Sequence, residues 1–84
     1  MELKDTISRM ISEDYKERFI SEYQQTSIRA AKLATLLNKV YEDDITFELS
    51  CPRTVLEEQL LAMHEYLDVL KIRASYENIE INEV

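Results

Sequence analysis

The chain has a single built-in break. It contains no glycine, and Pro52 is its only proline. Glycine supplies the left-handed backbone of most tight turns, and proline ends helices because it lacks a backbone N–H. The residues on either side of Pro52 are therefore free to form long helices. The same absence excludes glycine-rich phosphate-binding loops and nucleophile elbows.

Before Pro52, apolar side chains recur at helical spacing in two segments. The longer segment predicts a helix over residues 13–41, with Ser12 as its N-cap. Its apolar positions are Tyr15, Phe19, Tyr23, Ala30, Leu33, Leu37 and Val40. The shorter segment predicts an amphipathic helix over residues 1–11. Its apolar face consists of Leu3, Ile7, Met10 and Ile11.

After Pro52, a second apolar seam alternates by four and three residues, which is typical of a packed helix. This seam predicts a helix over residues 52–77, preceded by a loop over 42–51 and followed by a tail over 78–84. Thr54 and Glu57 have the spacing of a capping box, and Asn78 suits a left-handed helix end. The seam is formed by Leu56, Leu60, Met63, Leu67, Leu70 and Ala74.

Two long helices joined by a short loop predict an all-α fold, an antiparallel two-helix hairpin with a short N-terminal helix. At 84 residues, the chain forms one domain, 1–84. Within the loop, apolar and polar residues alternate from Ile45 to Leu49, which is a weak strand signal. Pairing of residues 45–49 with 79–81 is the alternative to an irregular loop and tail.

The second helix is apolar on more than one face. Val69, Ile72 and Tyr76 lie off its main seam, and a helix with two apolar faces needs two partners. A chain this short also has a small core, and with Cys51 as its only cysteine it has no internal disulfide to strengthen it. We therefore predict a homo-oligomer whose interface includes Val69, Ile72 and Tyr76.

The formal net charge of −7 arises in the second half of the chain. Residues 43–84 carry three basic and ten acidic side chains, whereas residues 1–42 carry seven of each. Such a chain is a poor partner for long duplex nucleic acid. No apolar run approaches the length of a membrane span, and the first residues do not resemble a signal peptide. These features predict a cytoplasmic protein that binds no membrane.

The pattern favours binding over catalysis. His64, the only histidine, lies four residues before Asp68, but no serine or cysteine is placed nearby for it to activate. Adjacent carboxylates such as Glu57 and Glu58 point apart on a helix, which favours a solvated acidic surface over a metal site. We predict no enzyme activity, no catalytic residue, no metal site and no cofactor.

A polar line runs beside the second seam. Gln59, Tyr66 and Arg73 are spaced by seven residues, so they lie on one edge of the helix. They either hydrogen-bond across helices and set the register of the assembly, or they line a pocket between subunits. In the first helix, Arg29 and Lys32 share a face, where they either pair with the acidic second helix or bind phosphate.

The second helix also carries the pattern L-x-x-Q-x-x-x-M-x-x-Y-x-x-x-L-x-x-R. It resembles a family of short phage accessory proteins, two-helix hairpins first recognised in crAss-like phages. Arg18 and Phe19, in the stretch DYKERFISEY, fit the same family. The resemblance covers about Asp14 to Ile79 and leaves out residues 1–13 and 43–51. The pattern is formed here by Leu56, Gln59, Met63, Tyr66, Leu70 and Arg73.

This resemblance implies a function. The family's architecture is similar to that of phage hairpins that act as sponges, which hold cyclic dinucleotide or cyclic ADP-ribose signals of antiphage defence between subunits. It implies a counter-defence protein that sequesters a small anionic nucleotide signal in the cytoplasm of the infected bacterial host without cleaving it. The alternatives are an acidic inhibitor of a host defence nuclease and a structural assembly factor. The implied ligand-binding residues are Tyr15, Arg18, Arg29, Lys32, Gln59, Tyr66 and Arg73.

Overall fold

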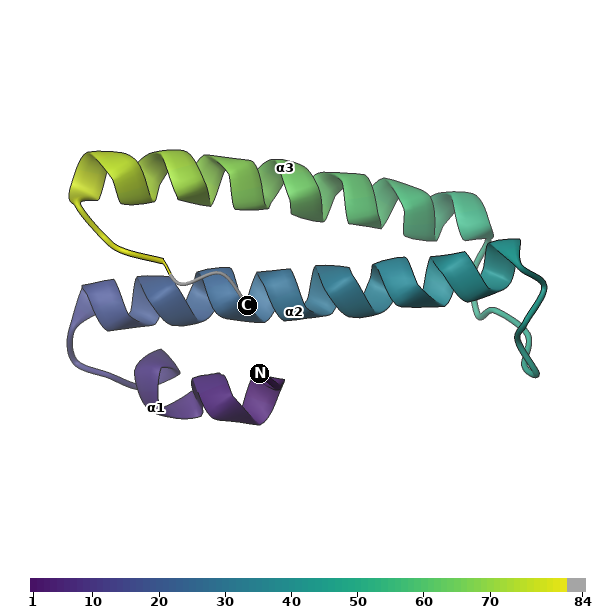
Figure 1. Cartoon of the computed structure of the whole chain (residues 1–84), viewed down its shortest axis with the longest axis horizontal. Coiled ribbons are helices and arrows are strands. Elements are labelled where there is room, and N and C mark those ends of the chain that lie inside the picture. The colour runs from purple at the N-terminus through teal and green to yellow at the C-terminus, as the bar shows by residue number, and fades with distance from the viewer. Residues whose placement is uncertain (82–84) are drawn as a thin grey trace.

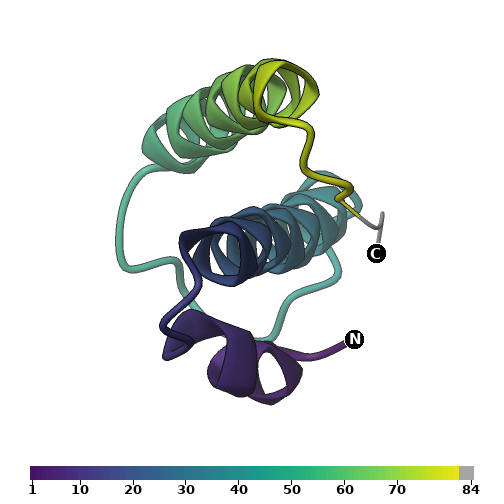
Figure 2. The ribbon, with the colours of Figure 1, turned by 90° about the vertical axis from the view of Figure 1, so that its left-hand side faces the viewer.

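The computed structural model describes residues 1–81 and contains four helical elements. These are the 3₁₀ turn η1 (Leu3–Thr6), α1 (Ile7–Met10), α2 (Tyr15–Tyr41) and α3 (Arg53–Glu77). Figure 1 shows α2 and α3 side by side and antiparallel, with η1 and α1 folded back along the opposite side of α2. The view down the helices in Figure 2 shows the same order, with α2 in the middle layer. The predicted all-α hairpin with a short N-terminal helix is therefore confirmed.

The core lies between α2 and α3, towards the end where α2 begins. Its buried side chains come from both helices and from the C-terminal segment that follows α3. That segment turns back beside α2 (Figures 1 and 2). Ile79 is thereby buried in the core, and Ile81 packs against it. The buried members of this cluster are Phe19, Tyr23, Leu70, Ala74 and Ile79.

The strand signal in the loop was misleading. None of residues 1–81 forms a strand, so neither 45–49 nor 79–81 pairs as a ladder; the rest of the tail, 82–84, lies outside the described residues. The residues that follow α3 bury their isoleucines against the helices. A five-residue alternation is a weak signal. In the loop Phe47 stays exposed, and in the tail burial against the helices takes the place of strand pairing.

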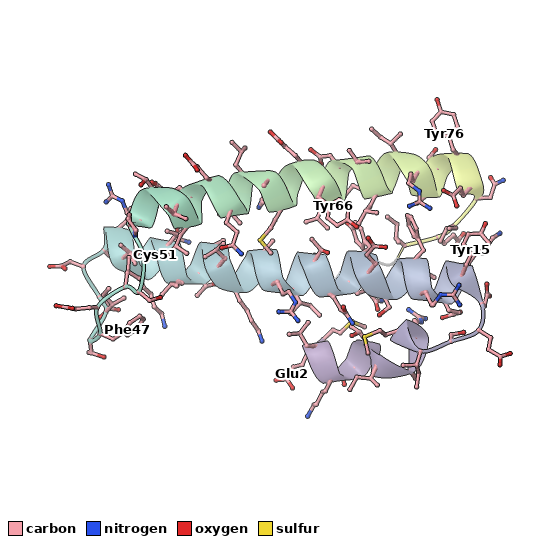
Figure 3. All side chains as sticks on the ribbon, turned by 180° about the vertical axis from the view of Figure 1, so that it is seen from behind. Glu2, Tyr15, Phe47, Cys51, Tyr66 and Tyr76 are labelled. Carbon is pink, nitrogen blue, oxygen red and sulfur yellow. The ribbon has the colours of Figure 1, made fainter. Side chains whose placement is uncertain are left out.

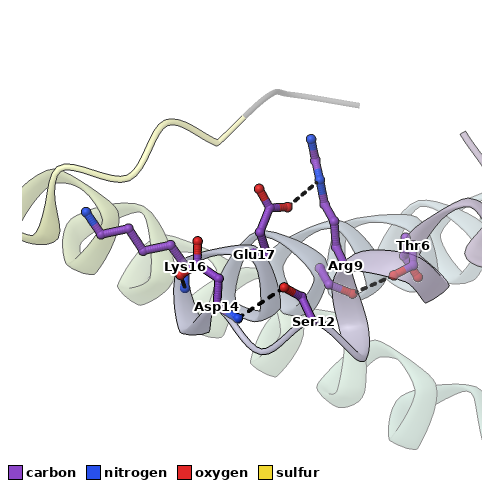
Figure 4. Close-up of polar contacts among 7 residues, drawn as sticks. Thr6, Arg9, Ser12, Asp14, Lys16 and Glu17 are labelled. Atoms are coloured by element: carbon purple, nitrogen blue, oxygen red, sulfur yellow. Dashed lines mark hydrogen bonds and ion pairs between the residues drawn. The ribbon is translucent and has the colours of Figure 1, made fainter.

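The N-terminal segment (residues 1–11) attaches to α2 through polar contacts. The Ser21 hydroxyl donates to the Thr6 carbonyl at 3.1 Å, and Gln25 Nε2 donates to Thr6 Oγ1 at 2.9 Å. Thr6 and Ser21 are both buried. An ion pair of 2.9 Å between Arg9 and Glu17 adds a contact at the surface (Figure 4). Because buried polar groups need partners, these bonds hold the segment in one orientation.

The predicted apolar face of this segment is mostly exposed in the single chain. Ile7, Met10 and Ile11 are exposed to solvent, and only Leu3 of the four is partly buried. The segment starts as a 3₁₀ turn, which advances about 120° per residue instead of about 100°. This difference rotates the later side chains away from the face that a continuous helix over 1–11 would present.

The long helices begin one or two residues later than predicted. Asp14, not Ser12, caps α2: its carboxylate accepts from the Lys16 N–H at 3.0 Å, while Ser12 Oγ accepts from the Asp14 N–H at 3.1 Å (Figure 4). In α3 the N-cap position is Pro52, and no side chain caps the helix. The predicted capping box is therefore wrong, because the Glu57 carboxylate faces Tyr41 of α2 instead.

Both long helices end at a left-handed residue that is not glycine. Asp43 follows α2 with φ 56°, and Asn78 follows α3 with φ 56° and ψ 45°. The next N–H, that of Ile79, donates to the Ala74 carbonyl at 2.9 Å, which directs the chain back towards the core. Asparagine tolerates this conformation better than most residues, so the predicted helix end at Asn78 is confirmed.

Replacing Asn78 with valine should therefore destabilise the protein. A β-branched residue at positive φ costs about 1–2 kcal/mol, whereas Asn78→Gly should leave stability within about 0.5 kcal/mol of the wild type. Urea unfolding followed by circular dichroism measures both variants at one protein concentration. Equal stability of the valine and glycine variants would show that the left-handed backbone at this position is not what limits the choice of residue.

Candidate functional site

A groove opens between α2 and α3 near the loop that joins them. Its volume is about 390 Å³. The floor is apolar and includes Leu37, which is buried, and Leu60, which is partly buried. Four residues of each helix line it: Ala34, Leu37, Asn38 and Tyr41 from α2, and Glu57, Leu60, Leu61 and His64 from α3.

The C-terminal segment occupies the other end of the same side of the hairpin. Leu67, which packs against the core with Ile81, lies two turns along α3 from Leu60 in the groove. Likewise, Ile20 lies five turns along α2 from Asn38, at the same angle around the helix. We call this side of the hairpin the groove side. Its space is filled by isoleucines at one end and open at the other.

A polar cluster stands at the loop end of the groove. The Tyr41 hydroxyl donates a hydrogen bond to Glu57 Oε2, which joins the last turn of α2 to the first turns of α3. Arg53 Cζ lies 5.4 Å from the centre of the Tyr41 ring, and Arg53 Nε lies 3.9 Å from Glu57 Oε1. The arginine therefore contacts both partners loosely, and its side chain is half-exposed.

The Glu57 carboxylate raises the pKa of Tyr41 above its usual value near 10. The main cause is the hydrogen bond, which is lost when the phenol ionises, followed by burial and by the charge of Glu57. Arg53 acts in the opposite direction, because a nearby cation favours the phenolate.

Replacing Glu57 with glutamine should lower the pKa of Tyr41. The amide still accepts the hydrogen bond, but it carries no charge to oppose the phenolate. A ¹³C NMR titration of the tyrosine Cζ resonances measures this shift, and Tyr41→Phe identifies the resonance. An unchanged pKa would mean that the contact between Tyr41 and Glu57 is not formed in solution.

Two further polar side chains stand at the groove without partners. Within residues 1–81, neither the Asn38 amide nor the His64 imidazole makes a side-chain hydrogen bond or ion pair, and both residues are exposed. The sequence had suggested a pairing of His64 with Asp68, but within residues 1–81 the two side chains form neither a hydrogen bond nor an ion pair. Together with Glu57, these side chains offer donors and acceptors above an apolar floor, which is the usual composition of a small-molecule site.

Asn38 and Tyr41 were not among the predicted site residues, and Glu57 and His64 were predicted as parts of an acidic surface and of a helix face. The hairpin predicts that the end of the first long helix lies beside the start of the second. It does not single out Tyr41 and Glu57, which stand at different distances from the loop. Each looked ordinary alone, because the groove exists only where both helices meet.

Five of the seven predicted ligand-binding residues lie on the other side of the hairpin. Tyr15 and Arg29 of α2 are fourteen residues apart, so they share one stripe, as do Gln59, Tyr66 and Arg73 of α3. The two stripes border the same side of the hairpin. Tyr15 and Glu22 lie along the first stripe, and both are close enough to Arg73 of the second stripe to raise its pKa. Figure 3 shows Tyr15 and Tyr66 on this face, which we call the Tyr66 side.

Arg73 is engaged within the protomer. Its Nε lies 2.8 Å from Glu77 Oε2, and its Cζ lies 4.8 Å from the centre of the Phe19 ring. The hydrogen bond to Glu77 raises the pKa of Arg73, while burial opposes the shift. A phosphate at this position would have to compete with the Glu77 carboxylate. Tyr66 and Gln59 are exposed in the single chain.

Arg18 lies eleven residues before Arg29 and so close to the same stripe of α2, but its side chain is engaged elsewhere. Arg18 Nη1 donates to the Ser12 carbonyl at 2.7 Å, beside the turn before α2. Lys32 borders a smaller hollow of about 190 Å³ that also includes Met1. Lys32 therefore lies on the side of α2 that carries the N-terminal segment. One protomer does not gather the seven residues into a pocket, so their joint role between subunits stays a prediction.

Within residues 1–81, no three His, Cys, Asp or Glu side chains are grouped so as to hold a metal ion. In the same part of the chain, no helix has the length and apolar character needed to cross a membrane.

Comparison with known proteins places the chain in a family. A family model described as Sequestin matches residues 5–76, from η1 to the last turn of α3. The match includes the loop and most of the N-terminal segment, which the phage-hairpin resemblance had left out. No curated protein and no solved structure matches the chain. Because the model covers more than half of the sequence, the chain belongs to the Sequestin family.

Proposed function

We propose that this protein binds and sequesters a small anionic nucleotide signal of antiphage defence, of the cyclic nucleotide or cyclic ADP-ribose type, without cleaving it. The observation that carries the proposal is the Sequestin match over residues 5–76, since the family name is consistent with sequestration. The groove supports it with a volume inside the range of small-molecule sites, about 300–1,000 Å³.

The chemistry of the groove suits retention of a ligand. Its lining combines apolar side chains with an amide, an imidazole and a carboxylate, which are groups that orient a ligand through hydrogen bonds. A sequestering protein needs tight binding to one state of its ligand and no stabilisation of a transition state. A phage counter-defence role follows if that ligand is the signal that switches on a host defence effector.

Isothermal titration against a panel of cyclic dinucleotides, cyclic trinucleotides and cyclic ADP-ribose isomers tests the proposal. We expect binding at sub-micromolar concentration, with the intact ligand recovered after the protein is denatured. Heat-denatured protein serves as the control for non-specific binding of the nucleotide. Absence of binding across the panel, on protein shown to be folded by circular dichroism, would contradict the proposal, and recovery of a cleaved product would contradict sequestration.

The acidic surface of α3 favours a second candidate, an inhibitor that binds a basic protein surface such as the nucleic-acid channel of a defence nuclease. Glu58, Glu65 and Asp68 are exposed and available to a partner, whereas Glu57 is engaged with Tyr41. Neutralising the three exposed acids should abolish inhibition of such a nuclease while leaving nucleotide binding unchanged. If nucleotide binding were lost and nuclease inhibition were unchanged, the result would favour sequestration over this second candidate.

We also propose that the protein self-associates through the outer face of α3. Val69, Ile72 and Tyr76 are exposed in the single chain, Tyr76 by 85%. Figure 3 shows Tyr76 pointing away from α2. An aspartate at position 72 should reduce the mass measured by light scattering, because a charge would be buried without a partner. Ser75→Asp, three residues away on α3, is the matched control; equal masses for wild type and Ile72→Asp would contradict this interface.

A further inference from the structure

We infer that the groove between α2 and α3 receives the purine base of the sequestered nucleotide, and that the phosphate lies outside it. This inference rests on the proposed function. It assigns the base and the phosphate of the nucleotide to particular side chains of the groove and its rim. The base lies on the floor near Ala34, with an N–H edge at Glu57, and the phosphate lies towards Arg53. None of these residues belongs to the ligand-binding set predicted from the sequence.

The charges of the groove exclude the phosphate from its interior. Among its described lining residues there is no lysine or arginine, and Glu57 contributes a carboxylate. Like charges repel at short range, most strongly where the walls are apolar. An uncharged ring avoids this repulsion, and its N–H groups are attracted to the carboxylate.

The shape of the floor suits a flat ring. Ala34 presents only a methyl group between larger neighbours, so the groove is open above it, and Leu37 and Leu60 provide apolar surface on both helices. Further along the same side, Ile79 and Ile81 fill the corresponding space. The isoleucines show that this side of the hairpin accepts apolar groups. Among the described residues, no side chain fills its loop end.

The rim offers hydrogen bonds that match a purine. Glu57 Oε2 accepts from Tyr41, whereas Oε1 lies 3.9 Å from Arg53 Nε, which is longer than a hydrogen bond. Oε1 is therefore available to a base N–H. Asn38 and His64, unpartnered within residues 1–81, can reach the remaining donors and acceptors of the ring. Guanine offers two adjacent N–H donors and adenine one amino group.

Arg53 stands just outside the groove, at its loop end. Its guanidinium lies over the Tyr41 ring at the loop end, half-exposed, and its ion pair with Glu57 is long. A guanidinium binds phosphate oxygens through two parallel N–H bonds, which are stronger than this contact. The groove and Arg53 together therefore provide one apolar and one cationic subsite.

Filling the groove tests the inference. Ala34→Leu places an isobutyl group on the floor, and it should weaken binding of cyclic di-AMP or cyclic di-GMP about 10- to 100-fold. Ala31→Leu is the matched control, because Ala31 lies one turn away on α2, outside the groove, and that change should leave affinity unchanged. Circular dichroism and light scattering establish that both variants keep the fold and mass of the wild type.

A second set of titrations tests which hydrogen-bonding groups of the base the protein contacts. Glu57→Gln should weaken cyclic di-GMP by about tenfold, since the amide oxygen stays with Tyr41 and an NH₂ donor then faces the base where Oε1 accepted. It should affect cyclic di-AMP less and cyclic di-UMP least. Arg53→Gln should weaken all three by a similar factor, because each carries the same phosphates.

The outcomes separate the inference from the proposed function. If the wild type binds a nucleotide and Ala34→Leu binds it equally well, the base lies elsewhere and the inference is wrong, while sequestration stands. If Ala34→Leu instead lowers the mass of the assembly, the groove is an interface between copies and the inference is likewise wrong. If the wild type binds no nucleotide of the panel, both fail.

Discussion

Phe19→Ala should lower the free energy of unfolding by about 3–5 kcal/mol. The Phe19 side chain is 4% exposed and sits in the cluster that joins α2, α3 and the C-terminal segment. Truncation removes the apolar transfer energy of the ring and leaves a cavity that the surrounding helices fill only in part. The ring also lies under the Arg73 guanidinium, so its loss removes a cation–π contact at the same time.

Urea unfolding at one fixed protein concentration measures this change. The fixed concentration matters, because self-association stabilises the folded state by mass action. Phe19→Leu is the matched control: it keeps much of the apolar volume and should cost less than half as much as alanine. A loss below about 1 kcal/mol for Phe19→Ala would mean that this end of the hairpin is not packed as described.

Leu70→Ala should cost about 2–5 kcal/mol. Leu70 is 1% exposed and belongs to the same cluster as Phe19, on the facing helix. Stability in proteins of this size amounts to about 0.05–0.15 kcal/mol per residue, so either core truncation removes a large share of it. We expect the thermal midpoint of Leu70→Ala to fall by about 10 °C or more.

Leu61 supplies the control for Leu70. The two leucines lie on the same helix, but Leu61 is 62% exposed at the rim of the groove. Leu61→Ala should change stability by about 0.5 kcal/mol or less. Equal losses for the two variants would show that α3 packs through a different face. Because Phe19 and Leu70 share one cluster, we expect their double variant to be non-additive.

The site was only partly accessible to sequence analysis. Heptad spacing correctly placed Gln59, Tyr66 and Arg73 along one stripe of α3, because that spacing is a property of a single helix. It did not join Tyr41 to Glu57, which are sixteen residues apart in the sequence and on different helices. A groove between helices depends on their relative rotation, and periodicity within one helix does not report it.

The sequence by itself determined the helices and where they end. Apolar spacing, the single proline at position 52 and the left-handed residue Asn78 act over a few residues, so they can be read locally. Only the tertiary structure decided how the N-terminal segment lies, because buried hydrogen bonds among Thr6, Ser21 and Gln25 link residues 15 to 19 positions apart. It also decided which end of the groove side the C-terminal isoleucines fill. That choice follows from the space that two helices leave between them, and this space exists only after they have packed.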